Sequence, residues 1–159
     1  MAKQNNLEQA RSTFATLCRS MENNNWPYEK DEEELTIHCA AQWEDLPMEV
    51  TVKVDDERSL VLLFSHLPFV VSEDKRLEMA IAISAINNDI VDGSFDYDVT
   101  SGNIVFRLTN SFIESKISAD VFTYMLACSF CTVDEFNDKL LMLSKGVLSL
   151  EQFISTLKK

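Results

Sequence analysis

The sequence predicts an α+β fold in which an antiparallel sheet of about five strands packs against helices. The first observation is that the spacing of apolar residues changes along the chain, from helical intervals to the alternation of strands and back again. The second is that short polar turns join consecutive strand segments, which favours hairpins. The expected order is one helix, three strands, a second helix, two strands, and then one or two helices.

The first half of the chain predicts a helix followed by a three-stranded meander. The helix is expected from residue 5 to about residue 22, where these apolar residues recur at helical spacing: Leu7, Ala10, Phe14, Leu17 and Met21. Apolar and polar residues then alternate over residues 35–42, 48–54 and 60–64, which is typical of half-buried strands. The polar run at residues 55–58 provides a turn before the last of these strands.

The second half predicts a helix, a hairpin and further helices. Residues 72–88 are expected to be helical, with a narrow face packed close to the sheet and made of Leu77, Ala80, Ile81 and Ser84. Strands at residues 95–99 and 104–108 are expected to form a hairpin, because turn-forming residues separate them. Helical spacing returns over residues 118–145, and a short last helix is expected to reach residue 157.

The composition favours a single domain spanning residues 1–159, since 46% of the residues are hydrophobic and 25% are charged. The net charge of −12 would repel nucleic acid and anionic membrane surfaces, so neither is expected as a partner. The chain has no apolar run that could span a bilayer and no signal-peptide pattern, which predicts a cytoplasmic protein. Two interpretations of the acidity stay open: solubility, or attraction of a basic partner surface.

The candidate chemical motifs do not indicate catalysis. Cys128 and Cys131 form a CxxC pattern, but no second pair completes a zinc site, so both thiols are expected to pack in the core. His38 and His66 lack the neighbouring nucleophile or carboxylate of a catalytic set. The acidic run at residues 31–34 is expected to be solvated, and the three glycines cannot form a phosphate-binding loop. The protein is therefore expected not to be an enzyme and to hold no metal or cofactor.

The two faces of the predicted sheet differ in composition. One face is expected to pack on the helices and carries Met48, Val50, Val52, Val54, Leu60, Leu62, Phe64, Ile104, Phe106 and Leu108. The opposite face mixes apolar with polar residues, as a protein interface does. It could be covered by the chain's own helix or by a partner. The candidate partner-binding residues are Val61, Leu63, Val105, Arg107, His38 and Lys53.

A resemblance to a known family covers about half of the chain closely, from Leu67 to about Gly146. The residues that carry it are Asn87, residues 92–98 (DGSFDYD), residues 102–107 (GNIVFR) and the later run at residues 125–137 with Gly146. In these segments the chain resembles the YbjN-type family of bacterial sensory transduction regulators, whose fold is like that of the type III secretion chaperones.

The resemblance implies helices packed on an antiparallel sheet, frequent homodimers, and no catalytic residues. It also implies a non-catalytic module that binds another protein, in a chaperone-like role or as a regulator in bacterial signalling. The alternative interpretation is a small-ligand sensor that holds an apolar molecule between the sheet and the helices.

Overall fold

The computed structural model describes residues 2–42 and 46–157, which contain a six-stranded sheet, four α-helices and one short 3-10 helix. The elements in chain order are α1 (Ala2–Asn23), β1 (Glu29–Asp31), β2 (Thr36–Gln42), β3 (Pro47–Asp55), β4 (Leu60–Val70), η1 (Glu73–Lys75), α2 (Arg76–Asp89), β5 (Ser94–Tyr97), β6 (Asn103–Ser111), α3 (Ala119–Ser144) and α4 (Leu150–Leu157). All neighbouring strands are antiparallel, in the order β1-β2-β3-β4-β6-β5. The expected α+β fold class is confirmed.

Strand β1 is the element that the sequence analysis missed, so the expected five strands become six in the described chain. Its three residues are all charged and all exposed, and they therefore show no alternation of apolar and polar residues. They pair with the start of β2, from Glu29 opposite His38 to Asp31 opposite Thr36. The segment that was expected to be a solvated acidic run thus begins inside an edge strand, and its side chains are solvated as expected.

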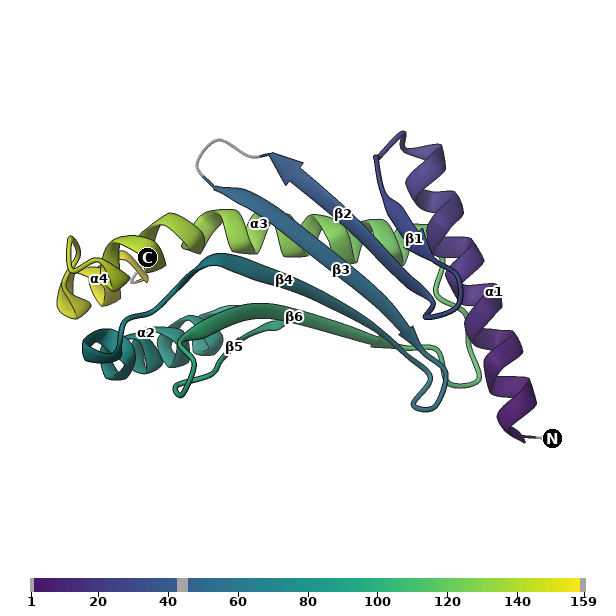
Figure 1. Ribbon diagram of the computed structural model, residues 1–159, viewed down its shortest axis with the longest axis horizontal. Coiled ribbons are helices and arrows are strands. Elements are labelled where there is room, and N and C mark those ends of the chain that lie inside the picture. Colours follow the sequence, from purple (N-terminus) through teal and green to yellow (C-terminus); the bar gives the residue numbers. More distant parts are fainter. Residues whose placement is uncertain (1, 43–45, 158–159) are drawn as a thin grey trace.

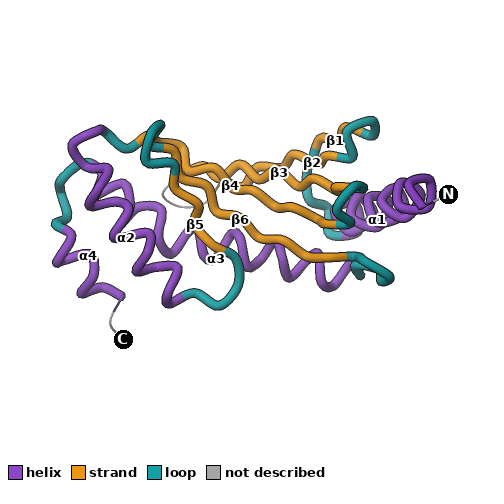
Figure 2. Tube along the Cα trace, turned by 90° about the horizontal axis from the view of Figure 1, so that it is seen from below, coloured by secondary structure: helices purple, strands orange, loops and turns teal. Residues whose placement is uncertain are grey.

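The helices lie on one side of the sheet (Figure 2). Helix α3 contacts β4 and β6, α2 contacts β5, and α1 contacts β3 and α3. Figure 1 shows α1 and α4 at opposite ends of the molecule, with α3 running between them. None of the described helices is long and apolar enough to cross a membrane. In the described part of the chain, no helix covers the second face of the sheet (Figures 1 and 2).

The core fills the space between the sheet and these helices. Phe95 of β5 contacts two other aromatic rings edge to face, Phe106 of β6 at 5.2 Å and Phe136 of α3 at 6.1 Å between ring centroids. Such edge-to-face pairs add to the burial of the rings themselves. The aromatic cluster therefore stabilises the packing of the β5–β6 hairpin against α3.

The alternation along β4 is opposite to the one expected from the sequence. Val54 pairs with Val61 and Val52 pairs with Leu63, so these side chains point to the same face, beneath the helices. Val61 and Leu63 are both fully buried. Their expected exposure on the helix-free face is wrong, and a buried side chain cannot form a docking surface for a partner.

The face of α2 that packs on the core is also different from the expected one. Its buried residues are Met79, Ala82, Ile83 and Ile86. Leu77 and Ile81, which were expected next to the sheet, are 76% and 48% exposed. The observed face has three large apolar residues, whereas the expected face has two, so the observed orientation of α2 buries more apolar area.

Candidate functional site

The helix-free side of the sheet, which we call the open face, has an apolar centre. Its members are the half-buried side chains of Leu60, Leu62, Phe64 and Val105. Pairing places Phe64 of β4 between Thr51 of β3 and Arg107 of β6, in the middle of the sheet. A sheet face that met only water would carry polar side chains at these positions.

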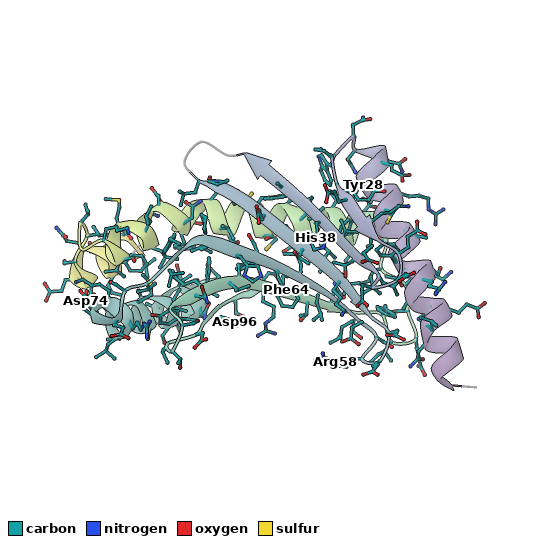
Figure 3. The ribbon with its side chains drawn as sticks, viewed as in Figure 1. Tyr28, His38, Arg58, Phe64, Asp74 and Asp96 are labelled. Carbon is teal, nitrogen blue, oxygen red and sulfur yellow. The ribbon has the colours of Figure 1, made fainter. Side chains whose placement is uncertain are left out.

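Polar and charged side chains surround this centre. On β2, His38 lies opposite Thr51, with 3.1 Å between His38 Nδ1 and Thr51 Oγ1. On the β3 side, Lys53 Nζ lies 3.8 Å from Glu34 Oε2. Figure 3 shows His38, Phe64 and Asp96 spread across this face, from β2 to β5. The open face thus has the apolar centre and polar surround of a protein interface.

An ion pair between β5 and β6 borders the apolar centre. Arg107 donates from Nε to Asp96 Oδ2 at 2.5 Å and from Nη2 to Asp96 Oδ1 at 3.1 Å. This two-pronged hydrogen bond lowers the pKa of Asp96 and raises the pKa of Arg107. Both groups therefore stay charged at neutral pH, and each provides the other with two hydrogen bonds.

Four of the six candidate residues lie on the open face as expected: His38, Lys53, Val105 and Arg107. Val61 and Leu63 are buried on the other side, and their places are taken by Leu60, Leu62 and Phe64. Whether the four residues bind a partner stays a prediction, since their position alone does not test it.

An apolar groove of about 310 Å³ runs beside β2, between the end of α1 and the middle of α3. Its lining residues are Met21, Trp26, Pro27, Cys39, Ala40, Ala41, Thr123, Leu126, Ala127, Phe130 and Cys131. The lining contains no Asp, Glu, Lys, Arg or His side chain. Burial raises the pKa of the Cys39 thiol to about 11, which keeps that thiol protonated at neutral pH. The groove can therefore take an uncharged group and would disfavour a charged one.

The expected core packing of the CxxC thiols is wrong for Cys131 and holds in part for Cys128, which packs against the edge of the core. Cys128 is half-buried and lies 4.0 Å from the Thr132 hydroxyl, whereas Cys131 is exposed along the groove. The buried stripe of α3 instead contains Leu126, Ser129 and Val133, which leaves the two cysteines beside it. Among the residues that the structure describes, no three His, Cys, Asp or Glu side chains gather as a metal site would require.

Comparison with known proteins identifies the family. Residues 13–142 match the model of the YbjN family, described as "putative bacterial sensory transduction regulator". No curated protein sequence matches the chain. The fold is similar to the crystal structure of YbjN from E. coli, with a TM-score of 0.59 and 13% identity over 84% of this chain and 92% of that one. It is also similar to a chain of the ExsC–ExsE complex, with a TM-score of 0.58 and 16% identity over 81% and 93%.

At these identities the two solved structures establish the fold and nothing further. The family match spans most of the chain, including β2, β3, β4 and β6 of the open face and most of α3. The chain belongs to the YbjN family.

Proposed function

We propose that this protein is a non-catalytic binding module, chaperone-like or regulatory in bacterial signalling, that receives another protein on its open face. The observation that carries the proposal is the apolar centre of Leu60, Leu62, Phe64 and Val105 on the helix-free face of the sheet. Apolar area left in contact with water gains free energy when a partner covers it. The regulator description of the family and the likeness to a chain that was solved in complex with ExsE support the proposal.

The net charge of this chain indicates which kind of partner segment it attracts. With a net charge of −12, the chain attracts basic segments and repels acidic ones, including nucleic acid and anionic membranes. We place the protein in the cytoplasm, where its four cysteines would remain free thiols. The alternative, a sensor that holds an apolar molecule between sheet and helices, stays a prediction, and the groove beside β2 is where such a molecule would bind.

The experiment compares the proteins captured by the wild-type chain with those captured by Leu62→Asp, a variant that has a charge in the apolar centre. Val99→Asp is the matched control, because Val99 is an exposed apolar residue in the turn between β5 and β6. Each captured protein is then purified, and its affinity for the three chains is measured by calorimetry. A protein that binds wild type and Val99→Asp but not a folded Leu62→Asp supports the proposal, and equal affinity for all three chains overturns it.

We also propose that the chain forms a homodimer through the exposed face of α2. Leu77 and Ile81 are one helical turn apart on this face, and the smaller Ala80 and Ser84 beside them allow a close approach of two helices. Light scattering should give twice the mass of one chain for wild type. It should give the monomer mass for Ile81→Asp, and a monomeric wild type would contradict the proposed homodimer.

A further inference from the structure

The outer edge of β2 is only partly paired. Strand β1 pairs only with residues 36–38 of β2, and its first residue, Glu29, lies opposite His38. On the other side of β2, Val54 N donates to Leu35 O at 3.0 Å, which makes that pair a hydrogen-bonded one. Because the two kinds of pair alternate along an antiparallel ladder, the backbone groups of Thr36, His38 and Ala40 point away from β3.

Ala40 is therefore the place where this edge is open. Thr36 and His38 face β1, but the N–H and C=O groups of Ala40 have no backbone partner on that side in residues 2–42 and 46–157. Pro27 lies in the segment that would continue the β1 ladder, and a proline has no N–H to donate to the Ala40 carbonyl. Pro27 thus keeps β1 from beginning earlier in the chain and leaves the backbone N–H and C=O groups of Ala40 free for another strand.

The free edge separates two depressions of different chemistry that share Pro27, Cys39 and Ala40. On the helix side lies the apolar groove of about 310 Å³, whose α3 wall includes the small residues Thr123, Ala127 and Cys131 together with Leu126 and Phe130. On the side of the open face lies a wider depression, whose lining includes the carboxylates of Glu29 and Glu49. Neither carboxylate forms an ion pair with a described residue.

We propose that an extended segment of the partner protein adds as a strand to β2 at Ala40, with apolar and basic side chains in alternation. Successive side chains of a strand point to opposite faces. One set would enter the uncharged groove, and the other would lie beside Glu29 and Glu49. The main-chain hydrogen bonds hold the segment, and the two depressions select its sequence. The inference rests on the proposed function and names the partner class and the point of attachment.

The test uses short fluorescein-labelled synthetic peptides and measures binding by fluorescence anisotropy. The probe peptide alternates leucine or valine with lysine or arginine. One comparison peptide has glutamate in place of each basic residue, and another has the same composition in scrambled order. The alternating basic peptide should bind about tenfold more tightly than either comparison peptide, because only its pattern matches both sides of the edge.

Three substitutions then locate the site. Ala40→Pro removes the free N–H but no bond to β3, and an edge strand tolerates such a proline; Ala40→Val keeps the N–H and is its control. Ala127→Trp fills the groove, and Glu135→Trp places the same side chain on an exposed position of α3 outside it. Glu49→Lys reverses the charge of the β3 residue opposite Ala40, and Glu57→Lys makes the same change in the turn after β3.

The expected result is that Ala40→Pro and Ala127→Trp each weaken peptide binding by about tenfold and Glu49→Lys by about fivefold, while the three controls bind as wild type does. In the wild-type complex, hydrogen exchange of the Ala40 amide should slow. Equal affinity of wild type and Ala40→Pro would overturn the inference, even if Ala127→Trp abolished binding, since the groove would then hold a side chain or a small molecule without strand pairing.

Failure of strand addition can be distinguished from failure of the proposed function by comparing variants at Ala40 and at Leu62. Partner capture that depends on Leu62 but not on Ala40 would overturn strand addition and leave the open face as the binding surface. Capture that depends on neither residue would overturn both.

Discussion

Leu62 and Leu63 are adjacent in β4, yet they belong to two different regions of the molecule. Leu63 is fully buried beneath the helices, opposite Val52. Leu62 is half-buried on the open face, opposite Lys53. Two residues of the same type in the same strand therefore differ in what their apolar area contacts. The leucine on the covered face is buried and stabilises the fold, whereas the one on the open face keeps part of its apolar area in water, where we propose that a partner binds.

Truncating each leucine to alanine gives the sharpest test of this difference. Leu63→Ala should lower the free energy of unfolding by about 2–5 kcal/mol, because it leaves a cavity between the sheet and α3. Leu62→Ala should lower it by less than about 1 kcal/mol, since its side chain is already in contact with water. Urea unfolding followed by circular dichroism measures both. Equal losses would contradict the assignment of the two faces.

The sequence predicts the order of elements well because apolar periodicity changes wherever a helix gives way to a strand. It does not predict which face β4 buries, because a shift of one residue in the pairing exchanges the two faces. The turn after β3 decides this point. Asp55 follows the buried Val54, so its carboxylate points to the open face. Asp55 pairs with Leu60, and Leu60 therefore points to the open face as well.

The same reasoning explains which part of the site could be found in advance. The prediction of Val105 and Arg107 for the open face succeeded because β6 alternates cleanly with the buried Ile104, Phe106 and Leu108. A pairing argument from Asp55 would have recovered Leu60, Leu62 and Phe64. The groove could not be foreseen, since it depends on three segments that are distant in the sequence and on where β1 begins.

The two edges of the sheet differ as its two faces do. At the β5 edge, the Asn87 side chain of α2 forms hydrogen bonds with both backbone groups of Phe95. Phe95 N donates to Asn87 Oδ1 at 2.8 Å, and Asn87 Nδ2 donates to Phe95 O at 2.9 Å. At the β2 edge, no side chain of the described residues makes such a pair of bonds with Ala40. One edge is blocked against a further strand, and the other is available.

Asn87→Ala would remove both hydrogen bonds to the Phe95 backbone. We expect the free energy of unfolding to fall by about 1–3 kcal/mol, because two hydrogen bonds are lost and the Phe95 backbone groups are left without a protein partner. Asn88→Ala is the matched control on the same helix, and its exposed side chain predicts a change within about 0.5 kcal/mol. Similar thermal unfolding of the two variants would show that Asn87 does not hold the edge.

The smallest expected effect concerns the ion pair of Asp96 and Arg107 on the open face. Hydrogen bonding to Arg107 lowers the pKa of Asp96 in the folded protein. A lowered folded-state pKa contributes stability above the unfolded value of about 3.9, and this contribution is lost as the pH falls through the folded-state pKa. Since the two side chains are 48% and 42% exposed, solvent screening limits it to at most about 1 kcal/mol.

Arg107→Met should therefore raise the pKa of Asp96 toward its ordinary value, as measured by a carboxyl-carbon NMR titration. It should also flatten the acid side of the stability curve below about pH 4. Lys53→Met removes a positive charge from the same face without touching Asp96, and it should leave that pKa unchanged. An Asp96 pKa that does not respond to Arg107→Met would mean that the two side chains separate in solution. Arg107 would then be a free charge beside Phe64, and the open face would present a basic rather than a neutral group to its partner.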